Sequence, residues 1–258
     1  MTTADGFFDV PRSPHPTSQG PVELPILYRD ATTVVAMFAV DRARAADALA
    51  DTGLVPLPLP RGRALAAVAF YEYRTTSVGR YNEVGVALMV TRAGEPARPW
   101  RWADLARPPA VRRLGMYVLD LPVSTPLADA AGRELWGYPK FVTELPLRVA
   151  GREVDATVLD PDGRTIVTFA GRLGPGVPAP PLSLMTYTRL GGSLIRTHVD
   201  VRGRSWLRAP GSARLRLGAS PHGMATRLRA LGLVDARPAI VLATDRFQSR
   251  LHAGTPAT

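Results

Sequence analysis

The feature of this sequence that most constrains its fold is a long series of strand-length apolar segments joined by turns. In the first half these segments are apolar at both odd and even positions, which is typical of strands buried on both faces. They are residues 32–40, 64–73, 83–91 and 115–123. The second half continues with shorter segments separated by turn signals such as Pro-Asp-Gly at 161–163. They are residues 140–149, 152–160, 164–173, 193–202, 213–218 and 238–247.

Three helices are predicted between the strands. The first begins at Asp41 as N-cap and runs to about Gly53, the second spans 125–135 with Thr125 as N-cap, and the third spans 222–233. Strands outnumber helices, and no GxGxxG or other Gly-rich phosphate loop follows a strand. We therefore predict a mostly β (α+β) fold, an antiparallel β-cone or barrel-like single domain with a few peripheral helices.

The length of 258 residues is enough for one large β domain. Residues 1–24 are irregular and rich in proline, and we expect them to form an arm on the surface. The domain is expected over 25–252, followed by a short tail, 253–258. The longest predicted loop, 92–113, contains four prolines.

Cysteine and histidine usage bears on metal chemistry. The chain has no cysteine, which excludes disulfides, thiolate nucleophiles and zinc sites built on sulfur. Its four histidines, His15, His198, His222 and His252, are far apart in sequence and form no HxH or HExxH motif. We therefore predict no metal site.

Nothing in the sequence predicts a membrane protein. The first residues include Asp5 and Asp9 and are followed by no apolar run of signal-peptide length. No stretch reaches the roughly 18 apolar residues of a membrane span. The expected location is the cytoplasm, with no membrane partner.

The net charge of +10 comes from arginines scattered along the chain. A nucleic-acid site would interleave such arginines with several stacking aromatic residues, and aromatic residues make up only 7% of this chain. The simpler interpretation is a solvated cationic surface, so we do not expect a nucleic-acid partner.

Lysine usage is unusual. Of the 32 Lys and Arg residues, Lys140 is the single lysine. This count could reflect a base-composition bias, or position 140 could need what arginine cannot provide. An ammonium can lose its proton and become a nucleophilic amine, whereas a guanidinium stays charged.

Lys140 lies in the segment GRELWGYPKF, residues 132–141, which leads from the end of a predicted helix through a turn. We expect Lys140 to be the first residue of the strand 140–149. Trp136, Tyr138 and Phe141 are expected to surround it with apolar area, which favours the neutral, nucleophilic amine over the ammonium.

This segment resembles the GRE…YPK motif of the acetoacetate decarboxylase superfamily. The resemblance implies that Lys140 forms an imine with a keto acid. Acetoacetate decarboxylase is itself a standard example of this use of lysine. LYRD (27–30) is similar to the segment of the active-site arginine, which implies that role for Arg29, and RYNEVG (80–85) implies an active-site glutamate at Glu83. The resemblance also places Met116, in MYVLD (116–120), and Tyr138 at the substrate. It further implies homo-oligomers and chemistry without a metal or organic cofactor.

Two departures from the family pattern bear on the reaction. Phe141 stands where the decarboxylase has a second lysine, and no glutamate occurs around residues 68–70, where Glu72 is the nearest. Fewer negative charges near the substrate would let a cation such as Arg29 retain the carboxylate. We therefore expect weak or no CO₂ release from acetoacetate.

Three functions remain open at this point. The first is a lyase acting on a small keto acid through a Lys140 imine, by decarboxylation or related carbon–carbon bond chemistry. The second is an aldolase-dehydratase acting on pyruvate-like 2-oxo acids with the same lysine. The third belongs to another class, a protein that only binds a small ligand or an anion.

Overall fold

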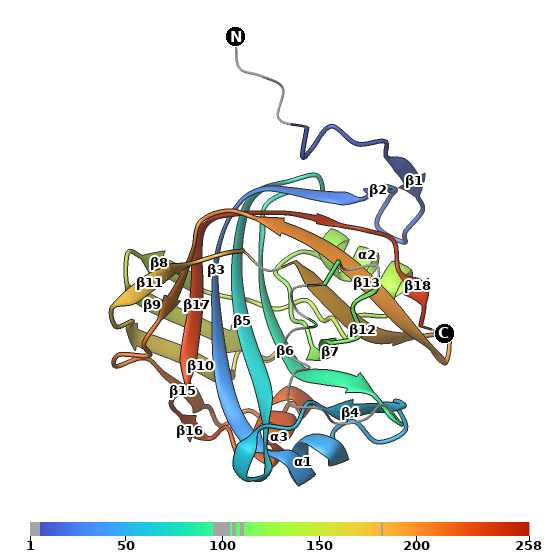
Figure 1. Cartoon of the computed structure of the whole chain (residues 1–258). Helices are drawn as coiled ribbons and strands as arrows, with labels where there is room; N and C mark the ends of the chain where they lie inside the picture. Colours follow the sequence, from blue (N-terminus) through green and yellow to red (C-terminus); the bar gives the residue numbers. More distant parts are fainter. Residues whose placement is uncertain (1–5, 95–103, 105–106, 109–110, 182, 258) are drawn as a thin grey trace.

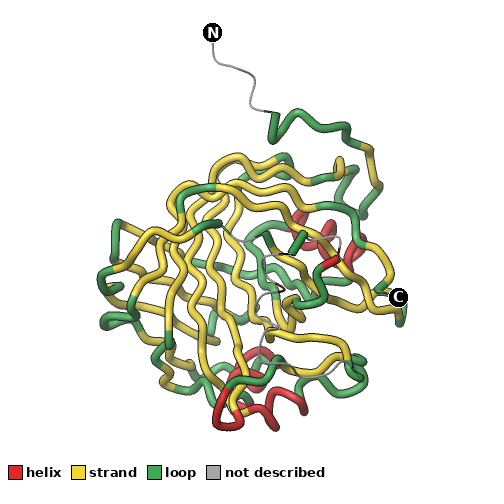
Figure 2. The backbone as a smooth tube through the Cα atoms, viewed as in Figure 1, coloured by secondary structure: helices red, strands yellow, loops and turns green. Residues whose placement is uncertain are grey.

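The computed structural model describes residues 6–94, 104, 107–108, 111–181 and 183–257. Most of the predicted loop 92–113 and the first five residues of the predicted arm therefore lie outside the described residues. Strands make up the body of the described chain, and helices lie at its periphery (Figure 2). The predicted mostly β, single-domain fold is confirmed.

Seven strands close into a barrel. Starting from β17, the pairing runs through β3, β5, β6, β7, β12 and β13, and β13 then pairs with β17 again. The described pairings are antiparallel except the one between β7 and β12. The barrel strands are β3 (Ile26–Asp41), β5 (Arg63–Thr76), β6 (Tyr81–Arg92), β7 (Gly115–Asp120), β12 (Leu184–Leu190), β13 (Ser193–Arg202) and β17 (Ile240–Leu251).

The long barrel strands have two buried faces, as their apolar pattern predicts. Successive side chains of a strand point to opposite faces of the sheet. On β3, Val34, Ala36 and Phe38 belong to the core outside the barrel, whereas Val35 and Met37 line the barrel interior. A single strand thus contributes to the folding core with one face and to an internal cavity with the other.

A second sheet covers the outer face of the barrel. It lies beside the long strands β17, β3, β5 and β6 (Figure 1). The stacked rings of Phe70 on β5 and Phe169 on β10, 5.1 Å apart between centroids, join the two layers. Its strands are β8 (Leu147–Ala150), β9 (Glu153–Leu159), β10 (Thr165–Arg172), β15 (Arg214–Leu217) and β16 (Asp235–Ala236).

The three predicted helices are present. α1 (Arg42–Asp47) is capped by the Asp41 carboxylate, which accepts from the Arg44 N–H at 3.0 Å. It is shorter than predicted, because residues 48–53 form turns. α2 (Pro126–Trp136) ends at Gly137, whose φ of 67° lies in the left-handed region that glycine adopts easily. α3 is Gly223–Ala230.

The predicted strand 140–149 is wrong for residues 140–146, and only its end is a strand. Regular pairing begins only with β8 at Leu147, and Lys140 lies in an irregular segment before it, where its N–H donates to the Tyr138 carbonyl at 2.8 Å. This segment runs beside the end of β7, where the Leu121 N–H donates to the Pro139 carbonyl at 3.0 Å. Pro139 and Pro146 have no N–H to donate, so a continuous ladder cannot form across this stretch.

Several short strands complete the fold. In the predicted arm, β1 and β2 form a hairpin, and in the predicted tail β18 pairs with β13. The short strands are β1 (Ser13–His15), β2 (Val22–Leu24), β4 (Leu54–Pro56), β11 (Gly176–Ala179), β14 (Ser205–Arg208) and β18 (Thr255–Pro256), with a 3₁₀ turn at Pro60–Gly62. Within the described residues, none of the helices has the length and apolar character needed to cross a membrane.

Candidate active site

The interior of the barrel holds a cavity of about 370 Å³. Its described lining comes from all seven barrel strands and is mostly apolar. The charged residues of this lining are Glu83, Arg112 and Lys140. Concave apolar sites with a few convergent polar groups are the usual setting for small-molecule binding.

Lys140 and Glu83 form an ion pair in the cavity wall. The Lys140 Nζ donates to Glu83 Oε2 at 2.6 Å, and the two side chains are only 6% and 9% exposed. Glu83 lies on β6, and Lys140 lies in the irregular segment after α2. The contact places a proton acceptor directly on the amine. Loss of a proton from the ammonium to this carboxylate would release the nucleophilic form of lysine.

Gly132 explains why the motif needs a glycine on α2. A β-carbon at Gly132 would overlap the Cδ and Cε atoms of Lys140 and would lie 3.2 Å from Nζ. The lysine side chain therefore crosses the helix at the one position without a side chain. The Tyr138 N–H also donates to the Gly132 carbonyl at 3.0 Å, which ties the turn before Lys140 to the same residue.

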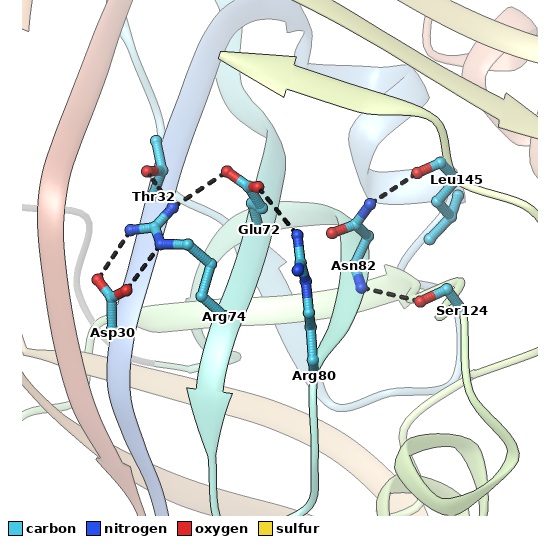
Figure 3. A network of polar contacts seen from close by, with 8 residues as sticks. All are labelled: Asp30, Thr32, Glu72, Arg74, Arg80, Asn82, Ser124 and Leu145. Atoms are coloured by element: carbon cyan, nitrogen blue, oxygen red, sulfur yellow. Dashed lines mark hydrogen bonds and ion pairs between the residues drawn. The ribbon is translucent and has the colours of Figure 1, made fainter. Parts of the chain in front are cut away.

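Asn82, next to Glu83, fixes the lysine segment against β6. Its backbone N–H donates to the Ser124 hydroxyl and its side-chain amide donates to the Leu145 carbonyl, both at 2.9 Å (Figure 3). Ser124 precedes α2 and Leu145 follows Lys140, so these bonds hold both ends of the motif segment. The approach of Lys140 to Glu83 is thus set by the backbone on both sides.

Five tyrosines cluster around the ion pair. They are Tyr28, Tyr71, Tyr73, Tyr81 and Tyr138. Burial, and in addition the negative charge of Glu83, raises the pKa of all five phenols above 10.0. They therefore stay neutral and can donate hydrogen bonds, as Tyr73 does to Glu83 Oε1 at 3.4 Å.

The predicted substrate-binding residues Tyr138 and Met116 both line the cavity. The Tyr138 hydroxyl is fixed by the Thr186 hydroxyl at 2.7 Å. Trp136 and Phe141, which were expected beside the lysine, are not part of this lining. The Trp136 indole donates to the His252 carbonyl at 2.9 Å, and the Phe141 ring packs on the His222 ring with centroids 4.5 Å apart.

Arg29 is not brought to Lys140. Tyr28 faces the cavity, and the next residue along the strand points to the other side. Arg29 is exposed and borders a separate hollow with Arg202, Arg204 and Arg246. The predicted role of Arg29 at the substrate carboxylate has no support from this placement.

Glu72 does not replace the family glutamate inside the cavity. It alternates with Tyr71 and Tyr73, which line the cavity, and so faces outward on β5. It accepts from Arg74 at 3.0 Å, and Arg74 also binds Asp30 (Figure 3). This network belongs to the outer surface of the barrel.

Arg112 is the cavity cation that the sequence did not indicate. It is 6% exposed and donates to the backbone carbonyls of Ser183 and Arg107. Its guanidinium thus belongs to the described cavity wall together with the Lys140–Glu83 pair. Burial lowers the pKa of Arg112, against the field of Asp104, yet an arginine stays charged under all ordinary conditions.

Two histidines that are distant in sequence meet on the outer face of β13 and at the end of β17. His198 and His252 stack with ring centroids 5.1 Å apart, and Asp200 lies 3.0 and 2.8 Å from their Nε2 atoms. The three donor atoms lie within 4.8 Å of one another, as metal ligands could. Arg250, however, donates twice to Asp200, at 2.6 and 3.0 Å, and already supplies a positive charge to this carboxylate.

Solved structures share this fold. An acetoacetate decarboxylase from Legionella pneumophila subsp. pneumophila str. Philadelphia 1 has a TM-score of 0.66 at 17% identity, over 98% of this chain and 94% of that one. The enduracididine biosynthesis enzyme MppR, complexed with the condensation product of pyruvate and imidazole 4-carboxaldehyde, has a TM-score of 0.61 at 16% identity, over 90% and 89%. An acetoacetate decarboxylase-like enzyme from Sphingomonas wittichii RW1 has a TM-score of 0.60 at 15% identity, over 90% and 92%.

No curated protein sequence matches the chain. The family model of acetoacetate decarboxylase (ADC), however, matches residues 9–237. That range includes the lysine motif, the strand that carries Glu83 and most of the cavity wall. The chain therefore belongs to the acetoacetate decarboxylase family.

Proposed function

We propose that this protein is a Schiff-base lyase that acts on a keto acid through an imine on Lys140. The observation that carries the proposal is the buried contact of 2.6 Å between Lys140 Nζ and Glu83 Oε2 on the cavity wall. Membership of the ADC family supports it, because the family includes enzymes that act on keto acids. The positive charge of Arg112 in an apolar cavity further favours an anionic substrate.

The proposed reaction begins with proton transfer from the Lys140 ammonium to Glu83. The free amine attacks the keto carbon, a C–N bond forms, and the carbonyl oxygen leaves as water. The resulting iminium accepts the electron pair of a neighbouring bond. In a 3-oxo acid this bond is the one to the carboxylate, which leaves as CO₂, and the enamine is then protonated at carbon. Hydrolysis of the iminium releases the product and restores Lys140.

A second candidate reaction uses the same imine for carbon–carbon bond formation or cleavage. The fold likeness to MppR, a protein captured with a condensation product of pyruvate, favours its consideration. In this reaction a 2-oxo acid loses a proton next to the iminium, and the enamine attacks an aldehyde carbon. The sequence suggests Arg29 as the cation that retains the substrate carboxylate. Because Arg29 lies outside the cavity, Arg112 takes this place in the proposal.

Reductive trapping tests the proposal. Acetoacetate, pyruvate and a 2,4-dioxo acid are each incubated with the protein and a hydride reductant. The mass of the intact protein is then measured by mass spectrometry. Because the chain has one lysine, the amine groups are Lys140 and the α-amino terminus, and fragment masses separate them. We expect an adduct on Lys140. Absence of any adduct would favour a protein that only binds ligands.

Lys140→Arg is the matched control. The positive charge facing Glu83 is kept, but the guanidinium is not a nucleophile. The variant should fold and should give no adduct at position 140. If the turnover of this variant stays within about tenfold of the parent, roughly 1.4 kcal/mol in barrier, the loss is too small for a missing covalent intermediate. Lys140 would then not be the nucleophile. The cytoplasmic location and homo-oligomeric state expected from the sequence stay predictions.

A further inference from the structure

The cavity is much longer than a three- or four-carbon keto acid needs. Along β5 its lining runs from Tyr73, beside Glu83, to Leu65. At about 3.3 Å per residue, these eight steps span about 26 Å of wall. The volume of about 370 Å³ lies within the range of roughly 300–1,000 Å³ that is typical of sites for drug-sized ligands.

The middle of the cavity is kept open by small side chains. On neighbouring strands, Ala67 pairs with Ala87 and Ala69 pairs with Gly85, and all four line the cavity. The opposite faces of the same strands carry large residues, such as Phe70 and Leu88, which are buried in the core. At these two pairs the small residues stand on the cavity side, where larger ones would occupy the space of a ligand.

The end of the cavity remote from Glu83 on β5 and β6 is mostly apolar and adaptable, with Arg112 two residues before Leu114 in the lining. It is formed by Met37, Leu65, Met89, Leu114 and Met116. With Met185, four of the six methionines of the chain line the cavity. Methionine side chains are flexible and polarizable, and they fit apolar groups of varied shape.

We propose that the substrate is a keto acid with an extended apolar substituent, with its keto group at Lys140 and its apolar body along the Ala67–Ala87 and Ala69–Gly85 pairs. This inference rests on the proposed imine chemistry. It adds that chain length determines affinity. A short keto acid leaves the apolar end of the cavity unfilled, whereas each added methylene moves apolar surface out of water.

The test compares two homologous series, straight-chain 2-oxo acids from pyruvate to 2-oxodecanoate and methyl ketones from acetone to 2-nonanone. The second series represents the products of 3-oxo acid decarboxylation. Each compound is trapped on Lys140 with cyanoborohydride, and the half-saturating concentration is measured. We expect this concentration to fall roughly fourfold for each added methylene until the cavity is filled.

Variants that fill the middle of the cavity provide the second arm. Ala67→Leu and Ala87→Leu should each raise the half-saturating concentration of the long compounds by tenfold or more, while pyruvate is still trapped. The melting temperature reports whether each variant folds. If a variant does not fold, the chain-length series on the wild-type protein still tests the proposal.

The outcomes separate the two proposals. Long and short compounds trapped on Lys140 with equal half-saturation would overturn the extended substrate and leave the imine chemistry standing. No adduct with any compound would overturn the imine chemistry, and this inference with it.

Discussion

Gly132 and Lys140 are in such close contact that a side chain on one excludes the observed position of the other. A β-carbon on Gly132 would overlap the Cδ and Cε atoms of the lysine. The two ends of the motif thus have linked roles, because the glycine gives the lysine its path across α2 to Glu83. The glycine of the motif is a requirement of the site rather than of the helix.

Gly132→Ala should therefore abolish imine formation while the fold persists. Alanine favours a helix over glycine by about 1 kcal/mol, which offsets part of the strain. We expect at least tenfold less trapping of keto acid on Lys140, with a small change in melting temperature. Gly223→Ala on α3 is the matched control, since its β-carbon would meet only Arg227, at 3.4 Å. Equal trapping by both variants would contradict the role of Gly132.

Glu83→Gln tests the proton acceptor. The variant leaves the buried Lys140 without its carboxylate, and breaking a buried pair typically costs about 3–5 kcal/mol. Loss of a general base typically lowers turnover by about 10²–10⁴-fold. We expect both effects, measured by denaturant unfolding and by the rate of adduct formation. The control is Glu72→Gln on the outer network, which should keep the adduct rate within about twofold.

Arg112 and Arg29 are distinguished by a paired substitution. Arg112→Gln removes a cationic side chain from the cavity wall, so the half-saturating concentration of anionic keto acids should rise at least tenfold. Neutral methyl ketones should be much less affected, which separates loss of charge from misfolding. Arg29→Gln should leave the half-saturating concentrations of keto acids and of methyl ketones within about twofold of the wild-type values. A larger effect at Arg29 than at Arg112 would restore the role expected from the sequence.

The strands were predictable where periodicity was strong. Residues 32–40 and 64–73 are apolar on both parities because one face meets the second sheet and the other lines the cavity. Strands of two or three residues, such as Asp235–Ala236, are too short to carry a periodic signal. The segment after Lys140 was misassigned because β-branched residues suggested a strand, while Pro139 and Pro146 prevent the ladder.

The candidate site was predictable only in part. Lys140 and Glu83 stand in motifs, and the structure brings their side chains together. The role of Arg29 came from a resemblance to the family pattern and stays a prediction; in the structure its side chain is exposed, next to Tyr28, which lines the cavity. Arg112 gave no local signal, since its position depends on the contacts that hold the residues before β7.

The stacked His198 and His252, where β13 pairs with β17, predict that the free energy of unfolding depends on pH in the acid range. Burial lowers the pKa of His198 from 6.5; Asp200 opposes this shift, and His252, Arg112 and Arg250 add to it. Because the unfolded state binds the proton more readily, stability should fall as pH drops through 6.5 towards the folded pKa. For one proton the slope is at most about 1.4 kcal/mol per pH unit.

A second loss follows at lower pH. Burial opposes ionisation of Asp200, but hydrogen bonds from His252 and Arg250 outweigh it, so the pKa of Asp200 is lowered from 3.8. The stability from this carboxylate is complete above pH 3.8 and is lost as pH falls through the folded pKa. The histidine window begins at pH 6.5 and the carboxylate window at pH 3.8, so the two losses of stability begin at different pH, and each can be removed by its own substitution.

His198→Gln isolates the first window. Between pH 7.5 and 5.5 its unfolding free energy, measured with denaturant, should fall less than that of the wild type. Asp200→Asn should keep this histidine step, because the carboxylate raises the pKa of His198 and its removal lowers that pKa further. His15→Gln, in the hairpin of β1 and β2, is the control and should follow the wild type. An unchanged pH slope in His198→Gln would show that the stacked histidines do not cause the acid sensitivity.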